Sequence, residues 1–560
     1  MGFRNSQWKT ATVLSVVAFT SFASVSAGSG ASFQPFTSFA HMRNDSTQTL
    51  TWFTDVNWWT MGKWNTDPNT VEGYITKKFG ISFEFNVPAQ DADTKLHLML
   101  VSGKLPDIIS LQDGTTEQEL IKSGKVWNLE EFFKKYDPTA LTDGTFPPDL
   151  VKLEKQTFGG FYSVPSWAST PDMVKKYPPA QKDHLYSANQ AVIYNEHIMK
   201  QAGLKLADLK TEDGLLKALQ KVKSMHLTYK GAPVIPLQID NSNQWYGSTV
   251  QALAQMFGAM PVDQKGNYRD LILSPEMKHA IDFLFKAAQM GALDRSQITL
   301  DTNGTNNVVR SGRVFCFIGN TANPHPETMW QTDPTETWVS PGPLLSNPYR
   351  RPTFGHAQYG LGWTQTYVSK SVQNPQIVAK WMHWMYSYDG EVLTNYGFAG
   401  KDYTVKNGLI YPTAQAKKYP SNYWETTGLG AFWFFNNGPF FSHVSPPPSD
   451  ESGKMVQQFK SAWPSSPLTY VYDSTPLQMP ATLIPPGSQL FQIQQQIRQY
   501  EETQVAKMIF APDAKTENQI YQQTIAQLHK MGLDQLQAVY NQQFHKQEQA
   551  FGEHLKGINP

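Results

Sequence analysis

Tryptophan, amide and carboxylate side chains gather directly after several predicted strands of this sequence. Two such groups follow the strand patterns at residues 49–53 and 233–239: Trp58, Trp59, Trp64, Asn243 and Trp245. An indole ring offers a flat apolar face that can stack on the CH face of a sugar ring, and an asparagine amide both donates and accepts hydrogen bonds. These residues favour reversible binding of a hydroxyl-rich ring compound, with packing in the core as the alternative for each aromatic side chain.

The stretch at residues 91–113 indicates how the fold would position such groups. Asp91 or Asp93 can cap a short helix, and Gly103 can end it. Leu96, Met99 and Leu100 are spaced i, i+3, i+4, which predicts that they share the buried face of this helix. Residues 108–109 are typical of a buried strand. Ligands of open α/β sheets bind at the carboxyl ends of strands, so we expect Asp113, just past this strand, to contact a ligand.

The composition limits the classes of partner. The chain has 560 residues, enough for two or more domains. Lys+Arg and Asp+Glu number 47 each, so no strong electrostatic field favours nucleic acid or an anionic membrane surface. Aromatic residues reach 13%, with 16 Trp and 24 Tyr. For each of these residues packing in a large aromatic core is the favoured interpretation, and a stacking surface for a sugar ring is the alternative.

Residues 1–27 have the parts of a secretory signal. Arg4 and Lys9 precede an apolar run at residues 11–25, and small residues stand before Gly28. Residues 28–46 are rich in Ser and Gly, which predicts a flexible leader. No other stretch approaches about 20 apolar residues, so we expect an exported protein that is soluble after cleavage.

The residue patterns needed for covalent or metal chemistry are not found in the sequence. The single cysteine, Cys316, lies in a strand-like run and is expected to be a buried hydrophobe. Residues 263–270 lack the ligand spacing of an EF-hand and favour a hairpin turn. His383 has no partner at metal-ligand spacing, and Glu196 is placed where an acid suits a helix N-terminus. We expect no cofactor, no metal and no catalytic residue.

Four separated motifs resemble family-1 extracellular solute-binding proteins, the maltose-binding-protein-like receptors of ABC sugar importers. They are SGKLPDIIS at 102–110, SGKVWNLEEFFKKYDP at 123–138, IYN followed by AGL within 193–204, and a D-G-E…Y-G-x-x-G passage at 389–400. The resemblance implies an α/β, two-lobed periplasmic-binding-protein-like fold of type II with a ligand cleft between the lobes. It assigns residues 47–163 and 359–470 to lobe 1, and residues 164–358 and 471–560 to lobe 2.

The same resemblance implies further ligand-binding residues. Tyr162 and Trp167 line up with positions that often border the cleft, and Asn320 stands at a strand tip where maltose-binding-type receptors present an aromatic residue. Trp363 ends a glycine-punctuated strand, and Trp433 lies in an aromatic insertion at residues 429–441. Residues 26–29 resemble a lipobox with serine in place of the cysteine, which favours a released or periplasmic receptor over a lipid-anchored one.

The function implied by the resemblance is that of a substrate-binding component of an ABC transporter. We expect a monomer that is not an enzyme, binds a carbohydrate of oligosaccharide size and delivers it to the permease subunits. A secreted glycoside hydrolase is the first alternative, and it would need two facing carboxylates either about 5–5.5 Å or about 6.5–9.5 Å apart. A sugar-sensing or adhesive surface protein is the second.

Overall fold

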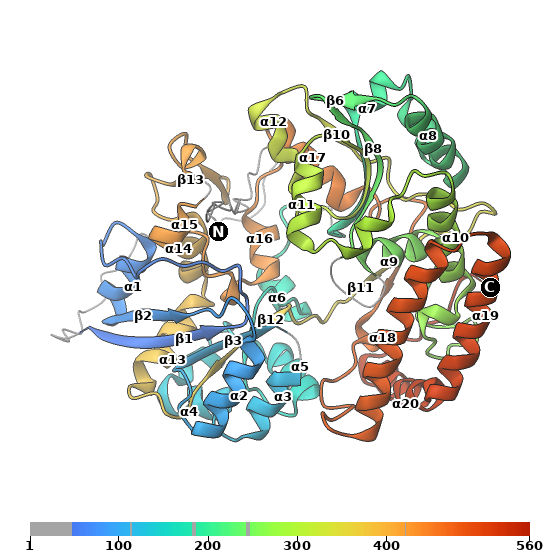
Figure 1. The fold of residues 1–560 in the computed structure, drawn as a ribbon. Coiled ribbons are helices and arrows are strands. Elements are labelled where there is room, and N and C mark those ends of the chain that lie inside the picture. Colours follow the sequence, from blue (N-terminus) through green and yellow to red (C-terminus); the bar gives the residue numbers. More distant parts are fainter. Residues whose placement is uncertain (1–46, 113–114, 182–185, 242–246, 421, 560) are drawn as a thin grey trace, which may run out of the picture. The chain divides into compact units, whose positions relative to one another are not determined.

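The computed structural model describes residues 47–112, 115–181, 186–241, 247–420 and 422–559. The chain divides into two compact units (Figure 1). Unit 1 contains Met1–Ala180 and Tyr359–Pro447, and unit 2 contains Gln181–Gln358 and Pro448–Pro560. Each unit is built from segments that are distant in sequence, and each has its own sheet and hydrophobic core. The predicted α/β fold class is confirmed.

Unit 1 contains a mixed five-stranded sheet with the order β2-β1-β3-β12-β4. β1 is parallel to β2 and β3, with Trp52 opposite Ile108, whereas β12 is antiparallel to β3 and β4. The strand bounds are β1 (Gln48–Thr54), β2 (Ile81–Asn86), β3 (Ile108–Gln112), β4 (Val164–Pro165) and β12 (Thr364–Val368), with a separate hairpin of β13 (Tyr403–Lys406) and β14 (Leu409–Pro412).

The helices of unit 1 contribute to its core, where Trp381 and Met382 of one helix lie in one cluster with Trp52. They are α1 (Val71–Phe79), α2 (Ala92–Ser102), α3 (Thr115–Lys122), α4 (Leu129–Tyr136), α5 (Pro148–Phe158), α6 (Pro171–Lys176), α13 (Pro375–Met385), α14 (Tyr388–Tyr396), α15 (Trp424–Thr427) and α16 (Gly438–Val444). The predicted helix and strand at residues 91–113 are confirmed as α2 and β3. Asp91 occupies the N-cap position of α2 without a side-chain capping bond, and Asp93 instead accepts a hydrogen bond from Thr116 at 2.7 Å.

The core of unit 1 absorbs much of the aromatic content. Trp52 is fully buried in β1, and its ring contacts Trp59, Phe83 and Trp381 at centroid distances of 5.3–5.7 Å. The indole Nε1 of Trp52 donates to the Ser110 hydroxyl at 2.9 Å, which satisfies the one polar atom that a buried tryptophan carries. The high aromatic fraction is therefore mainly a packing feature in this unit.

Unit 2 contains a four-stranded sheet with the order β10-β5-β9-β8. β9 lies between β5, to which it is antiparallel, and β8, to which it is parallel. Cys316 is fully buried in β9, as predicted. The strand bounds are β5 (Gln190–Asn195), β6 (Thr228–Tyr229), β7 (Ala232–Pro233), β8 (Ile235–Ile239), β9 (Val314–Asn320), β10 (Trp338–Val339), β11 (Thr353–His356) and β15 (Tyr470–Asp473).

The helices of unit 2 include three long ones at the C-terminal end of the chain. They are α7 (Glu196–Gln201), α8 (Glu212–Ser224), α9 (Gly247–Met256), α10 (Pro275–Gln289), α11 (Thr302–Arg310), α12 (Met329–Thr332), α17 (Glu451–Ser461), α18 (Gln489–Ile509), α19 (Ala514–Met531) and α20 (Leu533–Phe551). No helix among the described residues is long and apolar enough to cross a membrane.

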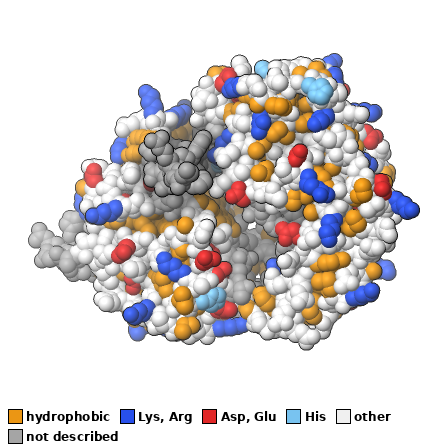
Figure 2. Space-filling view, in the orientation of Figure 1, with side chains coloured by type: hydrophobic (Ala, Val, Ile, Leu, Met, Phe, Trp, Pro, Cys, Tyr) orange, Lys and Arg blue, Asp and Glu red, His pale blue; other side chains and the backbone are white. Residues whose placement is uncertain are grey.

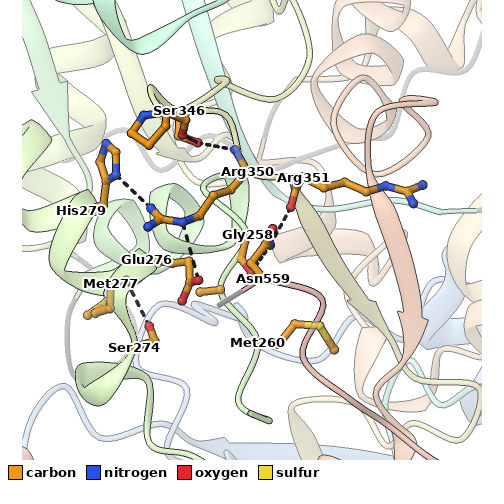
Figure 3. Close-up of polar contacts among 12 residues, drawn as sticks. Gly258, Met260, Ser274, Glu276, Met277, His279, Ser346, Arg350, Arg351 and Asn559 are labelled. Atoms are coloured by element: carbon orange, nitrogen blue, oxygen red, sulfur yellow. Dashed lines mark hydrogen bonds and ion pairs between the residues drawn. The ribbon is translucent and has the colours of Figure 1, made fainter. Parts of the chain in front are cut away.

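The chain tail after α20 folds back onto unit 2. Asn559 donates through Nδ2 to the carbonyl oxygens of Gly258 at 2.9 Å and Arg351 at 3.2 Å (Figure 3). Arg350, which precedes Arg351, donates to His279 Nδ1 at 3.2 Å, and its Nε lies 3.9 Å from the buried Glu276 carboxylate. The tail therefore helps to hold the segment that leads into β11.

The division between the units falls at different residues from those expected from sequence. The first crossing lies at 180/181 rather than 163/164, because β4 pairs with β12 and keeps the following segment in unit 1. The last crossing lies at 447/448 rather than 470/471. α17 belongs to unit 2 because it buries Met455 and Phe459 in one cluster with Trp338.

Candidate functional site

The candidate site lies where the inner strands β1 and β3 of unit 1 end, and we call this row of strand ends the edge of the sheet. Asp55 follows β1 directly, and Gln112 ends the neighbouring parallel strand β3. Trp363 precedes β12, and Thr364 at the start of β12 pairs with Gln112 because these two strands are antiparallel. The carboxyl ends of two parallel strands and the start of a third strand therefore meet at this edge, where ligands of open α/β sheets bind.

Asp55 is the acidic group of this edge. The main-chain N–H of Gln112 donates to its two carboxylate oxygens at 3.0 and 3.1 Å. Burial raises the pKa of Asp55 to about 6, the Gln112 N–H opposes this rise, and the negative charge of Asp93 adds to it. Asp55 can therefore accept a hydrogen bond from a ligand hydroxyl when ionised, and it is partly protonated in mildly acidic solution.

Three tryptophans form a group of stacked rings at the same edge, which we call the tryptophan stack: Trp58, Trp363 and Trp433. The ring centroids of Trp363 and Trp433 are 4.8 Å apart at an interplanar angle of 13°, and those of Trp58 and Trp433 are 5.3 Å apart at 22°. Trp58 and Trp363 are 6.0 Å apart at 19°. The rings come from the loop after β1, the residue before β12 and the 3₁₀ helix η7 (Trp433–Phe435).

The tryptophan stack keeps much of its surface in contact with solvent. Trp58 is 45% exposed and Trp363 is 41% exposed, whereas Trp433 is half-buried. Large aromatic side chains are usually among the more buried residues, so adjacent exposed indoles in near-parallel planes indicate a surface for stacking. The apolar face of a pyranose or furanose ring is the kind of partner that such a surface fits.

Trp167 provides a second exposed aromatic group. It is 40% exposed, and its ring lies 4.7 Å from that of Phe441 at an interplanar angle of 32°. Its φ of 53° is in the left-handed region, which a bulky L-residue adopts only under constraint from its surroundings. The Trp167 N–H donates to the Asn436 carbonyl at 2.5 Å, which contributes to that constraint.

Other predicted residues of unit 1 lie in the interior. Trp59 is fully buried and donates through Nε1 to the Ala431 carbonyl at 2.9 Å. Trp64 is 8% exposed and donates to the Thr76 hydroxyl at 2.8 Å. Tyr162 is half-buried against the cluster that includes Phe53 and Leu111. Of the three tryptophans that follow β1, only Trp58 reaches the exposed edge.

The predicted residues of unit 2 are only partly described. Asn320 ends β9 and is buried, with its side-chain oxygen accepting from the Ala322 N–H at 3.0 Å and its own N–H donating to Asp240 at 2.9 Å. The side-chain oxygen of Asn320 is therefore already hydrogen-bonded within the turn that follows β9. Asp113, Asn243 and Trp245 lie outside the described residues.

Sequence reasoning did not nominate Asp55, Gln112 or Phe441. Asp55 stands after β1 in the same way that Asp113 stands after β3, so the position rule used for Asp113 also selects it. Phe441 lies in the aromatic insertion, but sequence alone gives no means of pairing it with Trp167. The contact between them depends on two segments separated by more than two hundred residues.

His383 and Glu196, two titratable residues that lie outside this edge, have structural partners. His383 contacts Asp137 through Nδ1 at 2.9 Å and Asp143 through Nε2 at 2.7 Å. Glu196 accepts a hydrogen bond from the Thr337 hydroxyl at 2.6 Å. Over the part of the chain that the structure describes, no group of three or more His, Cys, Asp or Glu residues is placed to hold a metal ion. On the visible face, acidic and basic side chains are interspersed (Figure 2).

Comparison with solved structures shows that the chain has the fold of ABC-transporter solute-binding proteins. It is similar to an extracellular solute-binding protein from Bifidobacterium longum subsp. infantis, with 14% identity, a TM-score of 0.67 and coverage of 90% of this chain and 100% of that chain. It is also similar to the Streptococcus pneumoniae ABC-transporter substrate-binding protein FusA in complex with kestose, with 17% identity, a TM-score of 0.65 and the same coverage.

The chain also has a relative among proteins of known sequence. The chain is 21% identical over 374 residues to Lipoprotein LipO of Bacillus subtilis (strain 168), which covers 65% of this chain and 68% of that protein. No protein-family model matches the chain.

Proposed function

We propose that this protein is the substrate-binding component of an ABC importer and that its ligand is a carbohydrate of oligosaccharide size. The observation that carries the proposal is the tryptophan stack, in which the near-parallel indoles of Trp58 and Trp363 are exposed at the strand ends that also carry Asp55. Indoles supply apolar contact to a sugar ring, and the carboxylate accepts a hydrogen bond from a ring hydroxyl. The similarity in fold to FusA in complex with kestose supports the same class of ligand.

The physical chemistry of this edge is sufficient for reversible binding. Covering ~100 Å² of apolar indole and sugar surface contributes about 2–3 kcal/mol at roughly 25 cal/mol per Å². Two such contacts with a few hydrogen bonds reach about −8 kcal/mol after the cost of association, which corresponds to micromolar affinity. Release to permease subunits requires this reversible range.

The export of the protein is part of the proposal. The secretory signal pattern at residues 1–27 supports passage across the cytoplasmic membrane, and these residues lie outside the described part of the structure. LipO is named a lipoprotein, whereas residues 26–29 of this chain lack the cysteine of a lipobox. We propose an extracellular or periplasmic monomer that is not lipid-anchored through that motif.

Titration with defined oligosaccharides tests the function. Binding is followed by tryptophan fluorescence and thermal shift, and the same samples are assayed for new reducing ends. We expect a fluorescence change, a higher melting temperature and unaltered sugar in the wild type. Trp363→Ala should weaken binding about 10- to 100-fold, whereas Tyr349→Ala, which removes a more exposed aromatic ring in unit 2, should not. New reducing ends would replace the proposal with the glycoside hydrolase alternative.

A further inference from the structure

The two exposed aromatic groups of unit 1 are joined by a backbone contact that only glycine permits. A Cβ atom on Gly362 would lie 1.3 Å from the carbonyl oxygen of Ser166, which is far inside any contact distance. Gly362 precedes Trp363 of the tryptophan stack, and Ser166 precedes Trp167. The segments that carry these two tryptophans therefore touch at their main chains.

Hydrogen bonds fix this contact on both sides of Gly362. The Ser166 N–H donates to the Thr364 carbonyl at 3.0 Å, and the Thr364 hydroxyl donates to the Ser166 hydroxyl at 2.8 Å. Ser169 and Gly360 exchange two main-chain hydrogen bonds, each of 2.9 Å. Both hydroxyl-bearing residues at the contact are fully buried, so water does not compete for these bonds.

A third segment also holds the main chain at Trp167. The Asn436 carbonyl accepts from the Trp167 N–H at 2.5 Å, and the Asn436 N–H donates to the Trp433 carbonyl at 3.1 Å. The Asn436 side chain is buried and accepts from Asn395 Nδ2 at 3.0 Å. The main chain at Trp167 is therefore fixed between the segment of Trp363 and the segment of Trp433.

The left-handed conformation of Trp167 separates the two aromatic groups. β4 and β12 pair Gln365 with Pro165, so a continued ladder would set Trp363 opposite Trp167. Trp363 stacks on Trp433, whereas Trp167 packs on Phe441. A strained backbone persists only where the surroundings over-determine it, and such positions concentrate at binding sites.

We propose that the tryptophan stack and the Trp167–Phe441 pair are two stacking positions for two rings of one glycan, and that the Ser166–Gly362 contact fixes their separation. This inference rests on the proposed function. Trp167 is then a specificity-determining residue, and Gly362 is a positioning residue. The site selects ligands by length, because a short sugar reaches one stacking position and a longer one reaches both.

Binding constants along two homologous series test the inference. The probes are sucrose, kestose and nystose, and maltose, maltotriose and maltotetraose, each measured by calorimetry on wild type, Trp167→Ala, Trp167→Phe, Gly362→Ala and Tyr349→Ala. In the series that binds, we expect wild-type affinity to rise about 10- to 100-fold at the length that reaches the second position. Trp167→Ala should remove this rise and leave the shortest binding member within about twofold of wild type.

The remaining variants distinguish positioning from general damage. Trp167→Phe should restore most of the rise, and Tyr349→Ala should change nothing. Gly362→Ala should reduce the rise while the melting temperature still shows a folded protein, and if it does not fold, the two Trp167 variants decide alone. An equal effect of Trp167→Ala on short and long probes, or no effect, overturns the inference but not the proposed function. Failure of every probe to bind the wild type overturns both.

Discussion

The main-chain N–H of Gln112, at the end of β3, donates to both carboxylate oxygens of Asp55, which follows β1. This bond joins the ends of two parallel strands at the edge that carries the tryptophan stack. It also partly opposes the desolvation that raises the pKa of Asp55 to about 6. A ligand hydroxyl that donates to Asp55 would favour the ionised carboxylate further.

Ligand affinity should therefore depend on pH through Asp55. Because the ionised form accepts the hydrogen bond, we expect affinity to be constant above pH 7 and to fall as the pH drops below about 6, by up to tenfold per pH unit. Asp55→Asn should bind more weakly at neutral pH and show a flat profile. Dissociation constants measured between pH 5 and pH 8 check this, and a wild-type profile as flat as that of the variant would exclude Asp55 from the ligand contact.

Glu72 on α1 should make the stability of the protein depend on pH. Its side chain is fully buried, and one carboxyl oxygen accepts from the Asn65 N–H at 2.6 Å. Burial raises its pKa from 4.5 to about 8, so the folded state holds a proton that the unfolded state loses. The contribution of protonated Glu72 to the free energy of unfolding is therefore complete below pH 4.5, and it is lost as the pH rises through about 8.

Glu72→Gln should remove most of this dependence. We expect the wild-type free energy of unfolding to fall by a few kcal/mol between pH 5 and pH 9, and the variant to change much less. Urea denaturation at several pH values measures both slopes. Parallel slopes for the two proteins would assign the effect to other buried carboxyl groups, such as Glu154 or Glu391, whose pKa values burial also raises.

The neighbouring residues Trp58 and Trp59 should differ in what substitution affects: stability for Trp59 and sugar binding for Trp58. Trp59→Ala removes a fully buried ring and should lower the free energy of unfolding by about 3–5 kcal/mol. Trp58→Ala removes a ring that is 45% exposed and should cost less than about 1 kcal/mol of stability while it weakens sugar binding. Chemical denaturation and a binding titration on both variants separate these effects. A large loss of stability in Trp58→Ala would show that the tryptophan stack is a packing feature.

The tail contact of Asn559 should stabilise unit 2. Asn559→Ala deletes the donor to the carbonyl oxygens of Gly258 and Arg351, so we expect a loss of about 1–3 kcal/mol. Thermal unfolding of this variant beside Asn57→Ala, an exposed control, measures it. An unchanged melting temperature would mean that water replaces the amide without cost.

The elements of the fold could be predicted where local signals agree. The spacing of Leu96 and Leu100, with Gly103 after them, defines α2, and its left-handed terminus is observed at a φ of 73°. Ser274 and Pro275 likewise begin α10, and Ser274 accepts from the Met277 N–H as an N-cap. Helix caps and periodicity act within one or two turns, so the sequence carries them directly.

The candidate site could be predicted only in part, because contacts between distant segments decide which side chains are exposed. Trp58 and Trp59 are adjacent in the sequence, yet Trp59 is buried against Phe434 and donates to the Ala431 carbonyl, whereas Trp58 is 45% exposed. The crossing at 180/181 depends in the same way on the pairing of β4 with β12. Neither outcome has a local signature near the residue concerned.

The burial of Cys316 has a practical consequence. Cys316 carries the one thiol of the chain, and it is fully buried in the core beneath β9. This burial raises the pKa of the thiol well above the usual value. A maleimide dye should therefore leave the native molecule unlabelled and react selectively with a cysteine introduced at the surface, for example by Tyr349→Cys. The protein is in this respect ready for site-specific attachment of a fluorophore or for immobilisation on an electrode, without prior removal of its own cysteine.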